Sequence, residues 1–175
     1  MSNTEDGTGA SADENADALD TSQVPQVQIN AQYVKDLSFE NPNAPQSLMT
    51  QADSPQIQVS VDVGAQALGG NRFEVELRIT ANADRGETRM FVVEVLYGGV
   101  FTLVNVDQEN VKPVCLVECP RLLFPFARRV VADATRDGGF PPLLLEPIDF
   151  GAMYLNSEHN QQVQPAPAEN GDAKA

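Results

Sequence analysis

The chain has 175 residues, of which 42% are apolar, enough for one domain with a hydrophobic core. Its 25 acidic and 11 basic residues give a net charge of −14, which argues against nucleic acid as a partner because phosphates need a positive surface. No apolar run approaches the ~20 residues of a membrane-spanning helix and no signal peptide is recognisable, so we expect a cytoplasmic protein without direct membrane insertion.

Both ends of the sequence are acidic and low in complexity. Residues 1–24 hold six acidic residues and no basic one, set among Ser, Thr, Asn, Gly and Ala. Such a segment cannot bury enough apolar area to offset the entropy of ordering, so we predict a disordered acidic N-terminal tail. Residues 164–175 follow the same pattern and predict a disordered C-terminal tail, which leaves residues 25–163 as one folded domain.

The first half of this domain has the period of two that is typical of half-buried strands. Three segments alternate in this way and a fourth is almost wholly apolar: 27–33, 57–63, 73–79 and 90–97. One face of the first is expected to carry Val27, Ile29, Ala31 and Tyr33. A turn-rich connector at 38–45 and a GGN turn at 69–71 separate strands, and Gly98-Gly99 is expected to end the last one. Four strands followed by helices predict an α+β fold with an antiparallel sheet in a meander or near-meander.

Past Gly99 the pattern becomes helical. Pro120 suits the first turn of a helix because its missing N–H is not needed there, whereas Pro125 would kink the turns that follow. Gly138-Gly139 is expected to end this helix. Its apolar stripe has i, i+4 spacing and consists of Phe126, Val130 and Ala134, widened by Val131.

A second, shorter helix is predicted from Phe150 to about Gln161, with Asp149 as its N-cap. The segment between the two helices is unusually apolar for a loop, since Phe140 to Leu145 reads FPPLLL where polar turn residues are expected. Exposed apolar patches on soluble proteins mark interaction sites, so this loop must cover or bind something.

The strand at 90–97 is apolar on both faces. One face carries Phe91, Val93, Val95 and Tyr97, and the other carries Met90, Val92, Glu94 and Leu96. A sheet with helices on one side should have a polar opposite face. Two interpretations are equally compatible with this pattern: a central strand covered on both sides, or an interface with a partner that has Glu94 as an acidic anchor.

The sequence offers little catalytic chemistry. Cys115 and Cys119 lie one helical turn apart, but a zinc site would need two more ligands and the chain has a single histidine, His159. A disulfide is disfavoured because i and i+4 side chains of a regular helix are poorly aimed for it. We therefore expect neither a metal site nor an enzyme. Asp36 and Glu40 would point to one side of an extended chain, either as a solvated face or as a carboxylate pair.

Five segments carry a family likeness, and together they run through most of residues 27–162: YVKDLSFENPNAP (33–45), FEVELRITA (73–81), FVVEVLYGGVF (91–101), CPRLLFPFAR (119–128) and GGFPPLLLEPIDFGAMY (138–154). In this order they closely resemble the SecB family of proteobacterial export chaperones.

This resemblance implies a four-stranded antiparallel sheet with two main helices packed on one face. It implies a homotetramer, a dimer of dimers with the helices between the dimers and the sheets facing outward. The implied activity is ATP-independent: the chaperone holds unfolded preproteins in a translocation-competent state and passes them to the SecA motor, without a cofactor.

The resemblance also assigns roles to individual residues. Asp36, Glu40, Val92 and Glu94 match positions that dock the basic, zinc-bearing tail of SecA, with Val92 in place of a common Leu. Val93, Val95 and Tyr97 match positions linked to tetramer assembly, and Phe126 and Val130 lie on the helix implied to separate the dimers. Seven apolar residues match the client groove: Phe140, Leu143, Leu144, Leu145, Phe150, Met153 and Tyr154.

Two other functions stay open from the sequence. A SecB-like holdase of a toxin–antitoxin system would share the fold and the mechanism but serve a different client. A small enzyme of hot-dog-like build, acting on thioesters, would need a catalytic carboxylate or histidine at a dimer seam, which the position of His159 near the end of the chain disfavours.

Overall fold

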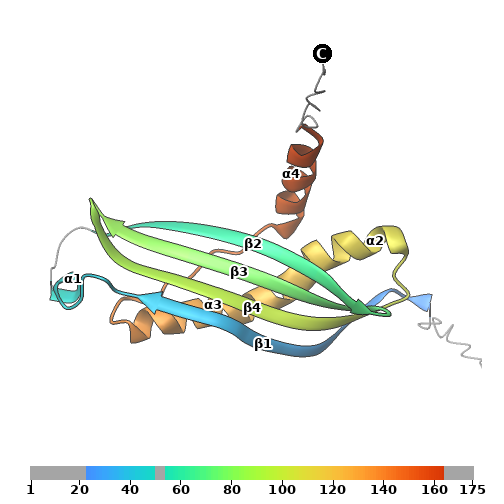
Figure 1. Cartoon of the computed structure of the whole chain (residues 1–175), viewed down its shortest axis with the longest axis horizontal. Coiled ribbons are helices and arrows are strands. Elements are labelled where there is room, and N and C mark those ends of the chain that lie inside the picture. Colours follow the sequence, from blue (N-terminus) through green and yellow to red (C-terminus); the bar gives the residue numbers. More distant parts are fainter. Residues whose placement is uncertain (1–22, 50–53, 164–175) are drawn as a thin grey trace, which may run out of the picture.

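The computed structural model describes residues 23–49 and 54–163. The predicted tails therefore lie outside the described residues, apart from 23 and 24 at the end of the first one. One antiparallel sheet dominates the fold (Figure 1), with strands in the order β1 (Gln26–Glu40), β4 (Thr88–Val104), β3 (Arg72–Arg85) and β2 (Gln56–Gly69). Strands β2, β3 and β4 form a meander, and β1 pairs with β4, so the predicted α+β class and near-meander are confirmed.

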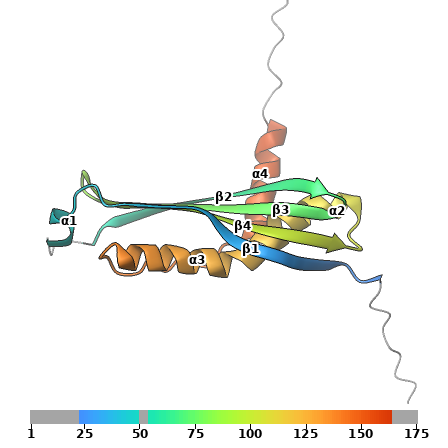
Figure 2. The same ribbon diagram turned by 60° about the horizontal axis from the view of Figure 1, so that its bottom comes forward.

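The helices are α1 (Gln46–Met49), α2 (Gln108–Pro113), a π-helical segment η2 (Val114–Glu118), α3 (Cys119–Asp137) and α4 (Phe150–Val163). Helix α3 lies along one face of the sheet (Figure 2), which we call the inner face. Helix α4 instead projects beyond the β2 edge of the sheet (Figures 1 and 2). The prediction that two main helices pack on one face is therefore wrong for α4, which contacts η2 rather than the sheet's face.

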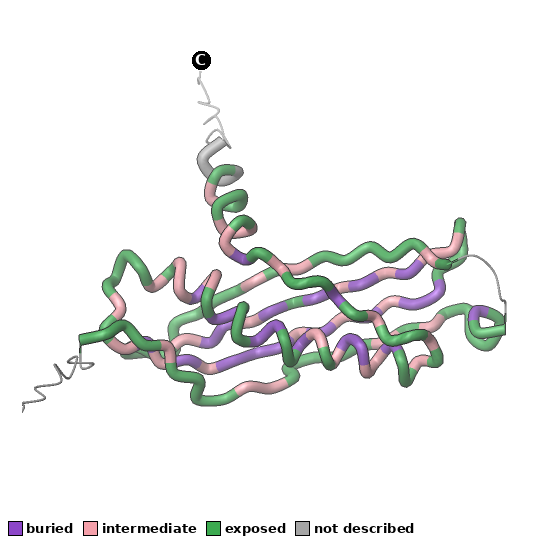
Figure 3. The backbone as a smooth tube through the Cα atoms, turned by 180° about the vertical axis from the view of Figure 1, so that it is seen from behind, coloured by how far each residue is buried: buried purple, intermediate pink, exposed green. Residues whose placement is uncertain are grey.

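The core lies between α3 and the two central strands (Figure 3). Inner-face side chains of β3 and β4 are fully buried beneath the helix, among them Leu77, Ile79, Val93 and Val95. Helix α3 contributes Leu123, Ala127 and Val131 to the same core. The edge strands β1 and β2 are largely exposed even where their side chains are apolar.

The buried stripe of α3 differs from the predicted one. Phe126 is 43% exposed and Val130 is half-buried, whereas Val131 is buried as expected. The helix continues through Pro125, and the change of helical pitch lies upstream, in η2. The expected stop is confirmed, since α3 ends at Asp137 and Gly139 has a φ of 87°.

The N-cap of α4 is also as predicted. Asp149 Oδ1 accepts the backbone N–H of Ala152 at 3.0 Å, and the helix begins at Phe150. This cap orients the helix as it leaves the long apolar loop.

Strand β4 does not end at Gly98-Gly99 but continues to Val104. The two glycines allow close packing on both faces of the strand rather than a turn. A Cβ on Gly98 would lie 2.7 Å from the ring of Tyr33, and a Cβ on Gly99 would lie 2.7 Å from Leu123 Cδ2. The predicted end of the strand was therefore too early, because glycine in a strand can also mark close packing rather than a turn.

Strand β1 is longer than predicted and includes residues 38–40 of the expected connector. Its alternation is interrupted by register shifts between Ile29 and Ala31 and between Val34 and Asp36. The first shift places Tyr33 opposite Gly98 on the outer face, so the expected single face of Val27, Ile29, Ala31 and Tyr33 is wrong. A shift at the other end of β4 buries Met90 to 2% exposure, so it does not lie with Val92 as predicted.

We expect Gly99→Ala to lower the free energy of unfolding by about 1–3 kcal/mol, because its Cβ would overlap Leu123 and Phe101 in the core. Gly64→Ala is the matched control, since a Cβ at this strand glycine would meet no atom within 4 Å. Urea unfolding at one fixed protein concentration measures both, and the control should change by no more than about 0.5 kcal/mol in the destabilising direction. Equal midpoints for the two variants would contradict the close-packing role of Gly99.

Candidate functional site

A series of hollows follows the inner side of edge strand β2, and we call it the β2 groove. Their volumes are about 550, 430, 210 and 460 Å³ in order along the strand. Consecutive hollows share a lining residue, which is Leu143, then Val61, then Leu116. The groove therefore runs from Ile57 to Ala67 along β2, beside the apolar loop at 140–148, then α4, then η2.

The apolar loop is fixed to the core at both ends. At its start, the ring centroid of Phe140 lies 4.9 Å from that of Phe91. At its end, Leu145 is buried, and Phe150 packs edge-on against Phe124 with ring centroids 6.0 Å apart. These anchors hold the intervening residues beside β2 without burying all of them.

Thr135 ties the middle of the loop to α3. Its hydroxyl is fully buried, hydrogen-bonds to the carbonyl of Val131 at 3.0 Å, and accepts the backbone N–H of Leu143 at 2.9 Å. A buried backbone N–H needs such a partner, so this one side chain fixes the height of the loop over the helix.

The structure brings most of the predicted client residues to the groove but not all of them to its surface. Leu144 is 63% exposed, and Phe140, Leu143, Met153 and Tyr154 are half-buried and line the hollows. Leu145 is 6% exposed and Phe150 is 1% exposed. These last two therefore belong to the core, and Phe150 lines none of the hollows described above.

Sequence reasoning missed the opposite wall of the groove, which is the inner face of β2. Ile57 and Val59 are 44% and 45% exposed, and Val61 and Val63 are half-buried. The alternation of these residues was visible and correctly predicted a strand. The sequence of the strand did not indicate that it lies at the edge of the sheet, where α3 does not cover it.

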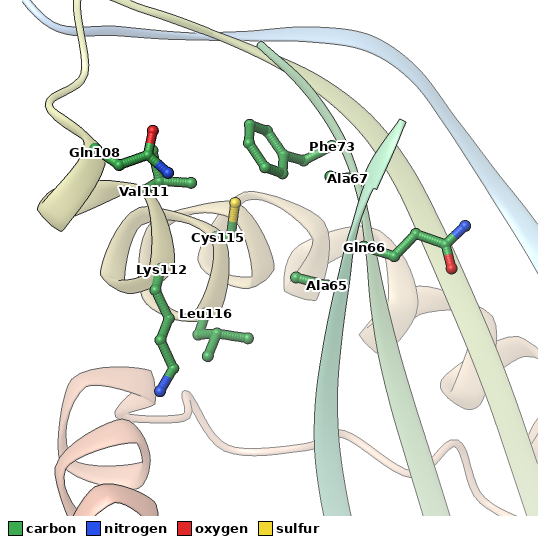
Figure 4. Close-up of a pocket in the computed structure, with 9 residues that line it drawn as sticks. All are labelled: Ala65, Gln66, Ala67, Phe73, Gln108, Val111, Lys112, Cys115 and Leu116. Atoms are coloured by element: carbon green, nitrogen blue, oxygen red, sulfur yellow. The ribbon is translucent and has the colours of Figure 1, made fainter. Parts of the chain in front are cut away.

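The far end of the groove lies between β2, β3 and the segment from α2 to η2 (Figure 4). Phe73, Val111 and Cys115 point toward one another across this hollow, while Lys112 extends toward α4. The Lys112 ammonium forms an ion pair with Glu158 and lies 5.9 Å from the ring centroid of Tyr154. These contacts tie α4 to α2 beside the groove.

On the outer face of the sheet, three neighbouring rows of residues contain the four positions predicted to bind SecA. Paired residues of adjacent strands share a face, so each row runs straight across the sheet. From β1 to β2 the rows are Asp36–Leu96–Arg78–Asp62, Ser38–Glu94–Thr80–Ser60 and Glu40–Val92–Asn82–Gln58. Asp36, Glu40, Val92 and Glu94 therefore lie together on one surface, which we call the acidic face.

Nothing among the described residues covers this side of β4. Val92, Glu94 and Leu96 are half-buried by their neighbours in the sheet alone. Of the two interpretations offered by the sequence, a central strand covered on both sides is wrong, because α3 covers the inner face only. An open outer face remains compatible with an interface.

A separate charged cluster lies next to the acidic face, where β1 crosses Gly98. The Tyr33 hydroxyl donates a hydrogen bond to Glu74, and the Lys35 ammonium contacts both Glu74, at 2.9 Å, and Glu76. The Tyr33 hydrogen bond, together with Lys35, holds the pKa of Glu74 below its usual range, and Glu76 and Glu74 raise the pKa of Lys35. The cluster therefore keeps Lys35 charged and directed at β3.

The residues predicted for oligomerisation fall into two groups. Val93 and Val95 are fully buried under α3 in the core of the subunit itself. Tyr97 and Phe126 stack at the boundary between sheet and helix, with ring centroids 6.5 Å apart, and Phe126 and Val130 face outward in part. Tyr97 itself is buried at 7% exposure, so of the predicted residues only Phe126 and Val130 are accessible to another chain.

The described part of the chain contains no cluster of metal-ligating side chains. No three His, Cys, Asp or Glu residues there come close enough to hold a metal ion. Cys115 and Cys119 are buried and unbridged, and His159 is exposed on α4. None of the described helices is both long and apolar enough to cross a membrane.

Comparison with known proteins identifies a family. The family model for preprotein translocase subunit SecB matches residues 20–162. A protein-export protein SecB from a Bradyrhizobium species is 57% identical over 137 residues, which cover 78% of this chain and 85% of the relative. The namesake from Parvibaculum lavamentivorans is 51% identical over 146 residues, covering 83% of this chain and 86% of the relative.

A solved structure has the same fold. It is a SecB-like chaperone of Mycobacterium tuberculosis in complex with a ChAD peptide from an antitoxin. The TM-score is 0.59 over 70% of this chain and 90% of that one, with 17% sequence identity. At this identity the likeness concerns the fold alone.

We expect Thr135→Val to release the apolar loop from α3, because the Leu143 N–H would lose its acceptor without a change in side-chain volume. The Leu143 amide should then exchange with solvent about tenfold faster, as measured by hydrogen exchange. Thr135→Ser keeps the hydroxyl and should keep the protection. Equal protection of Leu143 in the two variants would show that Thr135 does not hold the loop.

Proposed function

The chain belongs to the SecB family of preprotein translocase subunits, and we propose from this that it is an ATP-independent export chaperone. It acts in the cytoplasm, catalyses no reaction and uses no cofactor. It holds non-native precursor proteins in a translocation-competent state and delivers them to the SecA motor of the export pathway. Family membership carries this proposal, and the β2 groove and the acidic face supply a physical route for each of its two parts.

The β2 groove suits a client that has no fixed sequence. Unfolded chains share exposed apolar side chains and unpaired backbone groups. The groove offers apolar walls on both sides, from Val59 on the strand to Leu144 on the loop. Burial of apolar area is non-directional, so such a groove discriminates folded from unfolded chains rather than one sequence from another.

The length of the groove sets how much chain it can hold. Residues 57 to 67 of β2 extend over roughly 33 Å at about 3.3 Å per residue. An extended client would therefore lay about ten residues along it. A segment of that length is buried in a folded protein and accessible only before folding.

We propose that the chain assembles into a homotetramer, a dimer of dimers with the helices inside. Apolar side chains exposed on the helix side of the subunit support this arrangement. Leu122 and Phe126 are exposed on α3, and Val34 and Leu37 are exposed on the inner face of β1. Patches of this kind on a soluble protein mark contact surfaces.

Delivery would use the acidic face. Glu40 and Glu94 flank the half-buried Val92, and Asp36 lies two rows away, which suits a basic segment that also carries an apolar residue. The tail of SecA has this basic character in the family. Because the acidic face and the β2 groove lie on opposite sides of the sheet, SecA and a client would not compete for the same atoms.

A holdase of a toxin–antitoxin system is the second candidate, since the structural relative from Mycobacterium tuberculosis is bound to an antitoxin peptide. The relatives at 51–57% identity carry the name of the export protein. Their much higher identity favours export for this chain.

The wild-type protein is expected to suppress aggregation of a non-native preprotein at stoichiometric ratio, and Leu144→Asp should weaken client binding about tenfold. The loss follows from removing one exposed apolar side chain from the groove and adding a charge. Leu155→Asp is the matched control, because Leu155 is similarly exposed but lies on α4 outside the residues that line the hollows. Light scattering during dilution from denaturant measures both. Failure of a several-fold excess of wild type would contradict the chaperone function, and equal loss in both variants would contradict the groove.

Glu94→Lys should weaken binding of SecA by tenfold or more at low salt, because it reverses the charge at the centre of the acidic face. Client binding and the mass of the assembly should stay unchanged, since Glu94 faces away from α3 and the groove. Titration with SecA at about 0.05 M and about 0.3 M salt measures the effect, which should shrink as salt rises. An unchanged affinity at low salt would refute the docking role.

A further inference from the structure

One basic residue belongs to the rows that form the acidic face. Among the three rows that run from Asp36 to Asp62, from Ser38 to Ser60 and from Glu40 to Gln58, all of them described, Arg78 is the only basic residue. It stands opposite Asp62 on β2, with Glu94 on β4 one row away. A cation in the centre of a surface proposed to bind cations needs an explanation.

Arg78 is paired with Glu94. Its guanidinium Nη1 contacts Glu94 Oε1, and the side chains of Arg78 and Glu94 are 44% and 33% exposed. An ion pair this exposed adds little to stability, because water solvates both partners well when they separate. The pair is therefore strong enough to be formed in the free protein and weak enough to be exchanged for another.

The other three carboxylates in these rows have no cationic partner. Among the residues that the structure describes, no cation pairs with Asp36, Glu40 or Asp62. Lys35 is the neighbour of Asp36 in sequence, yet it contacts Glu74 and Glu76 on β3. Arg89, at the border of the acidic face, contacts Asp84 and hydrogen-bonds to Asn82 at 3.1 Å. The fold thus directs Lys35 and Arg89 to other partners and places Arg78 directly on Glu94.

We infer that Arg78 is an internal competitor for the basic partner, occupying Glu94 in the free protein until the partner displaces it. This inference rests on the proposed docking function and adds a regulating residue to it. A partner with a single cation gains little at Glu94, because it exchanges one pair for another of the same kind. A partner with several cations also engages the open Asp36 and Glu40, so Arg78 raises the selectivity for densely basic segments.

The decisive variant is Arg78→Gln, which frees Glu94 and leaves an uncharged polar side chain in its place. We expect it to bind SecA, and a fluorescein-labelled, zinc-loaded peptide of the basic SecA tail, about two- to fivefold more tightly than wild type. The control is Arg72→Gln, which removes the same charge from the same face of β3 near its other end. At about 0.1 M salt the Debye length is about 10 Å, so the control should change affinity by less than about twofold.

A double-mutant cycle separates competition from simple charge repulsion. If Arg78 occupies Glu94, then Glu94→Gln reduces the affinity for the partner more in the Arg78→Gln background than in wild type. In wild type the contact of Glu94 with the partner replaces the ion pair with Arg78, so its net contribution to affinity is smaller. Equal costs in the two backgrounds would mean that Arg78 acts through its charge alone, and would overturn the inference.

Weaker binding by Arg78→Gln would also overturn it, because Arg78 would then hold Glu94 in place for the partner. These outcomes presuppose that wild type binds the SecA probes. If wild type fails to bind at low salt, the docking function itself is overturned and the inference falls with it. Thermal unfolding of all variants serves as the check that each is folded.

Discussion

The structure depends on a mismatch of widths between one helix and four strands. A helix with its side chains is about 10 Å across, whereas four strands spaced about 4.8 Å apart need roughly 15–20 Å of cover. Helix α3 therefore buries the inner faces of β3 and β4 and leaves those of β1 and β2 largely exposed. The same alternating pattern produces core in the middle of the sheet and exposed apolar surface at both edges. On the β2 side that surface becomes the groove, and on the β1 side it joins the exposed residues of α3.

Close approach at the two central glycines makes this arrangement possible. Gly99 lets Leu123 of α3 sit directly on β4, so the helix is held low over the central strands. Gly98 lets the ring of Tyr33 lie across the opposite face and reach Glu74 on β3. Edge strand β1 is thus fixed across β4 to β3 by a side chain as well as by its backbone ladder. These two adjacent glycines allow close packing on opposite faces of the sheet, so a side chain at either position would clash with a packed neighbour.

The sequence predicted well whatever depends on local periodicity. Four strands, the end of α3 at Gly138-Gly139 and the cap at Asp149 follow from patterns within a few residues, and all are present. The sequence did not predict features in which a residue contacts a neighbour far along the chain. Gly98-Gly99 was predicted to end the strand because the sequence does not show that Tyr33 and Leu123 pack against these glycines. The faces of β1 were assigned wrongly because β-bulges have no clear sequence pattern. The resemblance to SecB predicted the acidic residues of the acidic face. It did not predict the ion pair of Arg78 with Glu94, because only the pairing of β3 with β4 brings these two residues together.

Strand β4 connects the two proposed binding functions through its alternation. Val93 and Val95 point inward beneath α3, while Val92 and Glu94 point outward to the acidic face. A shift of one residue would exchange the two sets, so burial of the inner pair also fixes the direction of the outer pair. A substitution at Val93 or Val95 would move α3 and, with it, the outward helix residues Phe126 and Val130. In the proposed tetramer, these buried positions would influence assembly through the helix, without being part of the interface between subunits. The outward side chains of β4 hold the positions that the proposed SecA contact requires only as long as the inner ones stay packed.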